Sequence, residues 1–132
     1  MSIKVDEDIL CAAALKIKLN FVLKPEQKLA IQEVCSRNDV LVVLPTGFGK
    51  SLIYSMIPIC FDVATQQEGH IILVISPLIA LMEDQVASLE SYGLNAACIS
   101  ENQKNDGQSL INWVFDISNN TAISPSLVLL CY

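Results

Sequence analysis

The segment L-V-V-L-P-T-G-F-G-K-S at residues 41–51 constrains the fold of this chain more than any other segment. Its apolar start predicts a strand over residues 40–44, its glycines predict a tight loop, and the residues after the loop predict a helix. Because glycine has no Cβ, Gly47 and Gly49 can adopt positive φ and bring backbone N–H groups close to an anion. The order strand, glycine loop, helix is typical of a phosphate-binding loop.

This loop supplies several candidate binding residues. The candidates for contact with a bound nucleotide are Thr46, Gly47, Phe48, Gly49, Lys50 and Ser51. Lys50 would reach the β- and γ-phosphates and is the candidate catalytic residue, and the Ser51 hydroxyl would ligate Mg²⁺. The strict pattern G-x-x-x-x-G-K-[ST] is broken at its first position, where the chain has Leu44. The alternative is a turn that holds glycine and lysine by chance.

The composition favours a small α/β domain. The chain has 132 residues, enough for one small domain, of which 52% are hydrophobic and only 6% aromatic. Parallel strands that are covered on both faces have this aliphatic-rich composition. The longest apolar run, residues 71–82, is interrupted by Ser76 and Pro77 and is too short to span a membrane. The acidic N-terminus is unlike a secretory signal.

Charge and cysteine usage exclude other classes. A net charge of −6 argues against strong non-specific DNA binding by this chain alone, because phosphate neutralisation needs lysine and arginine. The cysteines are Cys11, Cys35, Cys60, Cys98 and Cys131. They are odd in number and form no C-x-x-C pair, so we expect small buried side chains in a reducing compartment and no structural zinc. For His70, a structural position in a loop or at a strand edge is favoured over a catalytic role, since the sequence shows no partner for acid–base catalysis.

Hydrophobic periodicity predicts alternating helices and strands. Helices are expected over residues 6–19, 25–36, 49 to about 60, 78–89 and 109–117, and strands over residues 40–44, 71–75, 96–99 and 127–132. Pro58 predicts a kink or an early end of the third helix, and Gly93 predicts the cap of the fourth. Strands that alternate with helices favour a parallel sheet with right-handed crossovers.

Three motifs follow one another along the chain. They are L-K-P-E-Q at residues 23–27, L-P-T-G-F-G-K-S-L-I-Y at residues 44–54 and V-I-S-P-L-I-A-L-M-E-D-Q-V at residues 74–86. In order and spacing they resemble the RecQ family of ATP-dependent DNA helicases, which belongs to superfamily 2. The resemblance implies an incomplete RecA-like P-loop NTPase lobe, an α/β fold with a parallel β-sheet flanked by helices. Residues 1–20 would form a leading helix, and residues 21–132 the N-terminal part of the first lobe.

The resemblance also assigns residues outside the loop. Lys24 and Gln27 would contact the adenine of ATP, and the Gln27 amide matches the N6 and N7 edge of that base. The family usually has arginine in place of Lys24, and lysine lacks the planar group that stacks on a base. Taken alone, Gln27 would rather be read as a solvated residue at a helix start, and its place ahead of a phosphate loop favours nucleotide contact. Ser76, Pro77 and Leu78 would contact the backbone of single-stranded DNA.

The parent protein that the resemblance implies is a 3′–5′ DNA helicase that uses ATP and Mg²⁺ on single-stranded and duplex DNA, in repair and recombination. We expect it inside the cell, in the nucleus, without membrane contact. The family's D-E-x-H segment is absent from residues 1–132, so we expect a chain cut before it that binds ATP without useful hydrolysis. The alternatives are a truncated nucleotide-binding remnant without activity of its own, and a small P-loop kinase, whose lid and substrate insert have no counterpart here.

Overall fold

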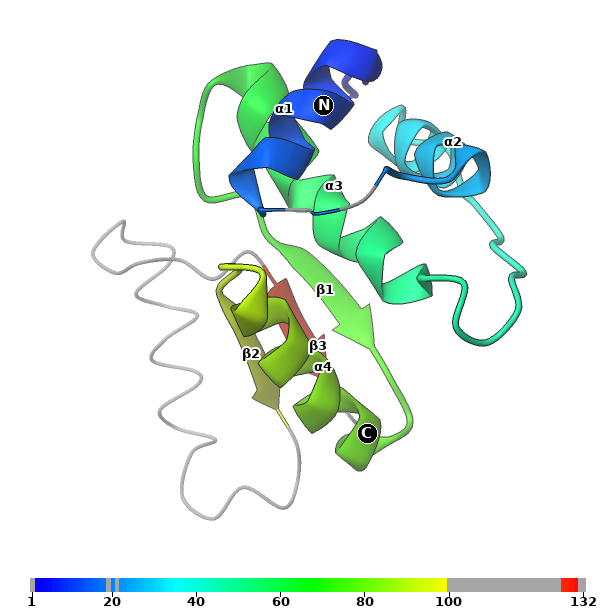
Figure 1. Ribbon diagram of the computed structural model, residues 1–132, viewed down its shortest axis with the longest axis vertical. Coiled ribbons are helices and arrows are strands. Elements are labelled where there is room, and N and C mark those ends of the chain that lie inside the picture. Colours follow the sequence, from blue (N-terminus) through cyan, green and yellow to red (C-terminus); the bar gives the residue numbers. More distant parts are fainter. Residues whose placement is uncertain (1, 19, 21, 100–126, 131–132) are drawn as a thin grey trace. The chain divides into compact units, whose positions relative to one another are not determined.

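Helices make up the first part of the chain, and strands with one further helix follow in the second. The computed structural model describes residues 2–18, 20, 22–99 and 127–130. Its elements, shown in Figure 1, are α1 (Glu7–Lys16), α2 (Pro25–Cys35), α3 (Lys50–Thr65), β1 (Ile72–Ile75), α4 (Ile79–Ser91), β2 (Ala96–Ile99) and β3 (Leu127–Leu130). They divide into two units, Met1–Ile72 and Leu73–Tyr132. None of these described helices is long and apolar enough to cross a membrane.

The first unit is organised around α3. Both α1 and α2 pack against this helix (Figure 1). Each helix contributes fully buried apolar side chains to the core, which include Leu10, Ala13, Ile31, Met56 and Cys60. Burial of such side chains stabilises the fold by roughly 1.5–3 kcal/mol for each large one. This core therefore fixes α3, whose first residue follows the predicted phosphate loop.

Local signals set three of the helix ends, whereas α1 ends at Lys16 and not at the predicted residue 19. The Asp6 carboxylate accepts a hydrogen bond from the Ile9 N–H at 3.0 Å and caps α1. Pro25 occupies the first position of α2, where its missing N–H has no intrahelical partner to lose. After α4, Gly93 has φ of +77° and donates to the Glu90 carbonyl at 2.9 Å. Gly93 therefore ends this helix in the left-handed conformation.

The third helix does not end at Pro58. α3 continues to Thr65, so the predicted early end is wrong. Proline in a helix interior costs on the order of 3 kcal/mol, because it removes one hydrogen bond and clashes with the preceding turn. Met56 and Cys60 on either side of Pro58 are completely buried. Packing of these neighbours against α1 and α2 offsets the cost that the sequence alone predicts.

The strand predicted over residues 40–44 does not form. Leu41 and Val43 are 90% and 82% exposed, whereas Val42 and Leu44 are half-buried, so the segment keeps the alternation of an extended chain. A strand also requires a neighbour that exchanges backbone hydrogen bonds with it. In the part of the chain that the structure describes, the sheet contains β1, β2 and β3 only. The strand prediction for this segment is therefore wrong.

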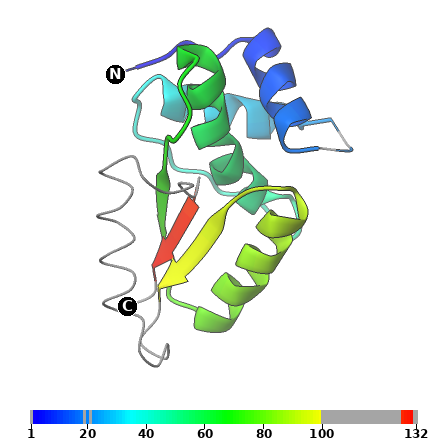
Figure 2. The ribbon, with the colours of Figure 1, turned by 90° about the vertical axis from the view of Figure 1, so that its left-hand side faces the viewer.

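The sheet has the strand order β1-β3-β2. β2 and β3 are parallel, with Ala96 opposite Leu127 and Ile99 opposite Leu130, and Figure 2 shows both arrows pointing the same way. α4 packs against β2 and buries Met82. These strands confirm the predictions for residues 72–75, 96–99 and 127–130. The helix predicted over residues 109–117 lies outside the described residues, as do the last two residues of the predicted final strand.

The cysteines only partly match their prediction. Cys35 and Cys60 are buried thiols in the core of the first unit. Cys11 lies exposed on α1, so the expectation of burial is wrong there. Cys98 is half-buried in β2, and Cys131 lies outside the described residues.

Candidate functional site

The predicted phosphate loop is a tight turn that leads directly into α3. The Phe48 N–H donates to the Pro45 carbonyl at 3.2 Å and closes the turn. Gly47 has φ of +82° and Gly49 has φ of +96°, values that glycine adopts without the strain of a Cβ. Gly49 is the residue before the first turn of α3. The positive φ predicted for both glycines is therefore confirmed.

The start of α3 offers hydrogen-bond donors and positive charge. The backbone N–H groups of Lys50 and Ser51 occupy the first helical positions, which have no acceptor within the helix. The helix dipole adds partial positive charge at this end. The Lys50 side chain is exposed, and its Nζ donates to the Leu44 carbonyl at 3.0 Å, so the ammonium group folds back over the loop. One turn along, burial raises the pKa of Tyr54, and the Ser51 side chain opposes this rise.

The Gln27 side chain contacts the backbone of the loop. Its side chain is only 2% exposed. The Nε2 group donates to the Phe48 carbonyl at 3.2 Å and to the Gly49 carbonyl at 3.1 Å, while Oε1 accepts from the Lys24 N–H at 2.9 Å. Two carbonyl acceptors on one side and one N–H donor on the other leave a single sensible orientation of the amide. We call these hydrogen bonds the Gln27 bridge. The reading of Gln27 as a solvated helix-start residue is therefore wrong.

Lys24 also contacts the loop. Its Nζ donates to the Phe48 carbonyl at 3.3 Å and lies 3.9 Å from the centroid of the Phe48 ring. An ammonium group over an aromatic face is attracted by the ring's negative centre. The structure thus brings together Lys24, Gln27, Phe48 and Gly49. The sequence predicted each of them as a nucleotide contact but did not reveal that they contact one another.

The residues predicted to contact DNA lie in the second unit, between β1 and α4. Ser76 is buried, and its hydroxyl accepts a long hydrogen bond from the Leu78 N–H at 3.5 Å. Pro77 is exposed, and Leu78 is 60% exposed. These residues follow the carboxyl end of a strand, as predicted. Pro77 and Leu78 present surface to solvent, whereas the Ser76 hydroxyl faces its own turn.

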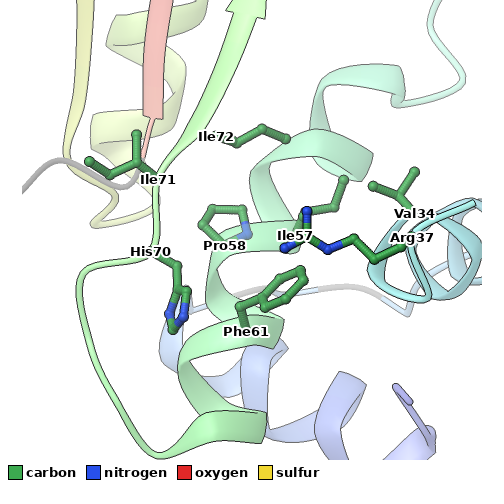
Figure 3. Close-up of a pocket in the computed structure, with 8 residues that line it drawn as sticks. All are labelled: Val34, Arg37, Ile57, Pro58, Phe61, His70, Ile71 and Ile72. Atoms are coloured by element: carbon green, nitrogen blue, oxygen red, sulfur yellow. The ribbon is translucent and has the colours of Figure 1, made fainter. Parts of the chain in front are cut away.

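A cavity of about 250 Å³ lies beside the C-terminal half of α3 (Figure 3). It is lined by Val34, Arg37, Ile57, Pro58, Phe61, His70, Ile71 and Ile72. No residue of the predicted phosphate loop is among them. This cavity is therefore distinct from the candidate phosphate site.

His70 has a carboxylate partner at this cavity that the sequence did not reveal. Its Nδ1 lies 2.6 Å from Asp62 Oδ1, and its backbone N–H donates to the same oxygen at 3.1 Å. The His70 ring also packs on Phe61, with 5.5 Å between ring centroids (Figure 3). The residues that line the cavity include no serine, threonine or cysteine that could serve as a nucleophile. The pair joins the end of α3 to the start of β1, which is a structural role.

Comparison with known proteins identifies relatives of this chain. Residues 24–123 match the DEAD/DEAH box helicase family. The ATP-dependent DNA helicase RecQ of Synechocystis sp. is 52% identical over 64 residues, which cover 48% of this chain and 12% of that protein. RecQ of Haemophilus influenzae is 40% identical over 85 residues, 64% of this chain and 13% of that protein.

A mammalian relative is matched over a similar share of its own length. The ATP-dependent DNA helicase Q1 of Mus musculus is 36% identical over 91 residues, which cover 69% of this chain and 12% of that protein. The matched region thus spans only 12–13% of the length of these relatives.

Proposed function

Because this chain belongs to the DEAD/DEAH box helicase family and is similar to RecQ helicases, we propose that it is the ATP-binding portion of a RecQ-like 3′–5′ DNA helicase. The family implies a RecA-like fold, and we assign residues 21–132 to the N-terminal part of the first lobe. The observation that carries the proposal is the loop itself. Gly47 and Gly49 adopt positive φ directly before a 16-residue helix, and the exposed Lys50 ammonium lies over that loop.

The proposed phosphate site uses the backbone around residues 46–51. The N–H groups of the loop and of the first turn of α3 would bind phosphate oxygens. Lys50 would exchange the neutral Leu44 carbonyl for a phosphate oxygen, because a hydrogen bond between two charged groups is roughly twice as strong. Mg²⁺ bound with ATP neutralises part of the phosphate charge, and Ser51 is the side chain that would hold it. The space beside Gly47 is open for a phosphate group, since a Cβ at this residue would meet no protein atom within 4 Å.

The other ligand contacts are proposals of the same kind. Lys24 and Gln27 remain the candidates for the adenine end of ATP. Pro77 and Leu78 are exposed at the carboxyl end of β1, which supports a contact with the backbone of DNA, and Ser76 would join them only if its hydroxyl left its own turn. We propose unwinding of duplex DNA and a nuclear location for the longer parent protein only.

Titration of ATP with Mg²⁺ into the wild type and Lys50→Ala tests the phosphate site. Removal of the charged phosphate partner should weaken binding by about 1.5–3 kcal/mol, roughly 10- to 150-fold. Lys16→Ala is the matched control, because it removes one positive charge from an exposed ion pair with Glu68 in the same unit. Equal affinity of the wild type and Lys50→Ala would defeat the assignment.

A nucleotide-binding module without ATP turnover is the second candidate function. This candidate is favoured because the region that matches this chain makes up only 12–13% of the length of the relatives. Phosphate release in the presence of single-stranded DNA separates the two readings. Binding of ATP without release supports the module, and DNA-stimulated release shows that residues 1–132 suffice for turnover.

A further inference from the structure

We propose that Gln27 positions the backbone amides that bind phosphate, so that its contribution to nucleotide binding acts through the loop as well as through the base. This inference rests on the proposed function and deepens it. It concerns the tripolyphosphate part of the ligand, which carries no adenine.

The geometry of two consecutive peptide units carries the argument. Gln27 Nε2 has two hydrogens, and they bind the Phe48 and Gly49 carbonyls at 3.2 and 3.1 Å. In a planar trans peptide the C=O and N–H bonds point in opposite directions. The N–H group of Gly49 belongs to the same peptide unit as the Phe48 carbonyl, and that of Lys50 to the same unit as the Gly49 carbonyl. Both N–H groups therefore face away from Gln27, toward one common side.

The backbone conformation of these residues is the one that concentrates N–H groups. Gly49 is left-handed, with φ of +96° and ψ of +40°, and Lys50 begins a right-handed helix. Successive residues of opposite hand turn their N–H groups inward around a concave site that binds anions. The Gln27 bridge holds this arrangement from the side opposite the anion.

Gln27 is itself held firmly enough to serve as a support. Its Oε1 accepts from the Lys24 N–H at 2.9 Å, and its side chain is only 2% exposed. Both Nε2 hydrogens are engaged, so adenine N7 could gain a donor from Gln27 only at the expense of a loop contact. Lys24 Nζ adds a second donor to the Phe48 carbonyl at 3.3 Å. The bridge therefore connects the start of α2 to the phosphate loop from the side opposite the proposed anion.

The approach of Gln27 to the loop also explains Gly49. A Cβ at this residue would lie 2.5 Å from Gln27 Nε2, whereas a Cβ at Gly47 would meet nothing within 4 Å. The two glycines thus differ in what requires them. Gly49 makes room for the bridge, and Gly47 leaves the ligand side of the loop open.

Titration with inorganic tripolyphosphate tests this inference, because the probe has no base for Gln27 to read. We expect Gln27→Met to lower the affinity for tripolyphosphate by roughly tenfold, since the amides lose their support. The control is Gln32→Met, which lies on the same helix and loses a comparable hydrogen bond from its Nε2 to the Val5 carbonyl at 3.1 Å. It should keep the wild-type affinity for tripolyphosphate.

The outcomes separate the possible roles of Gln27. If Gln27→Met weakens ATP binding but leaves tripolyphosphate binding unchanged, Gln27 reads only the base and the inference is overturned. If the wild type binds neither ligand, the proposed function fails, and the inference with it. If Lys50→Ala weakens both ligands and Gln27→Met weakens neither, only the inference fails.

A measurement on the wild type keeps the inference testable if Gln27→Met does not fold. In ¹⁵N NMR spectra the side-chain amide hydrogens of Gln27 should exchange slowly, both alone and with saturating tripolyphosphate. The backbone N–H signals of Gly49 and Lys50 should shift when tripolyphosphate binds. Fast exchange of the Gln27 side chain in the complex would show that the bridge opens, which overturns the inference.

Discussion

Substitution of the two loop glycines by alanine should separate backbone strain from the Gln27 bridge. Both residues have strongly positive φ, +82° at Gly47 and +96° at Gly49, so alanine at either site introduces left-handed strain of roughly 1–2 kcal/mol. Only at Gly49 does the new Cβ also meet a neighbour, at 2.5 Å from Gln27 Nε2. Gly47→Ala is therefore the internal control for Gly49→Ala.

The extra cost at Gly49 follows from the atoms involved. Nε2 is the end of a flexible side chain, so Gln27 can rotate away from the new methyl group. It then loses its bonds to the Phe48 and Gly49 carbonyls, which contribute about 0.5–1.5 kcal/mol each. Gly49→Ala should thus lower the free energy of unfolding by about 2–5 kcal/mol, against about 1–2 kcal/mol for Gly47→Ala.

Urea denaturation of a double-mutant cycle measures the difference. In a Gln27→Ala background the bridge is already lost, so Gly49→Ala should cost no more than Gly47→Ala. The coupling energy between positions 27 and 49 should be on the order of 1–3 kcal/mol, and that between 27 and 47 close to zero. Equal costs of the two glycine substitutions in the wild-type background, with no coupling to position 27, would refute the close approach of Gln27 to Gly49.

Two further predictions concern stability away from the loop. Burial raises the pKa of Cys35 from 9.0 to about 11, and burial with nearby Cys35 raises the pKa of Cys60 from 9.0 to about 12. The folded protein therefore holds these protons when the unfolded chain has lost them, so the free energy of unfolding should fall as pH rises above about 9, by roughly 1.4 kcal/mol per pH unit and thiol. Urea denaturation from pH 8 to 11 should show a smaller decline for the Cys35→Ala/Cys60→Ala variant, and identical declines would contradict the burial of the thiols. Asp62→Ala should lower the free energy of unfolding by about 1–3 kcal/mol, because two donors of His70 lose their acceptor. The exposed Asp39→Ala should change it by less than about 0.5 kcal/mol, and equal effects of the two substitutions would show that the Asp62–His70 pair contributes nothing.

Some helix boundaries were predictable because their causes lie within a few residues of the boundary. The Asp6 carboxylate reaches an N–H group three residues ahead, Pro25 cannot extend a helix backwards, and Gly93 adopts the left-handed conformation on its own. Pro58 shows the limit of such local reasoning. Its intrinsic penalty is real, yet α3 passes through it because the neighbouring side chains are buried against two other helices.

Residues 40–44 show a second limit. From Leu41 to Leu44, exposed and half-buried side chains alternate with the period of a strand. A strand, however, is defined by hydrogen bonds to another segment of chain, and apolar residues do not specify whether that segment is adjacent. The sequence could therefore indicate an extended conformation but not its pairing.

The sequence by itself determined the chemistry of the phosphate loop. Gly47 and Gly49 permit the positive φ values that the structure confirms, and Lys50 follows them wherever the loop lies. Only the tertiary structure decided what Gln27 and His70 bind. An amide or a carboxylate has the same donors and acceptors in every fold, so its partner depends on which segments pack together. Gln27 meets a loop more than 20 residues away because α2 packs against α3, and His70 meets a carboxylate on α3, the helix that precedes it.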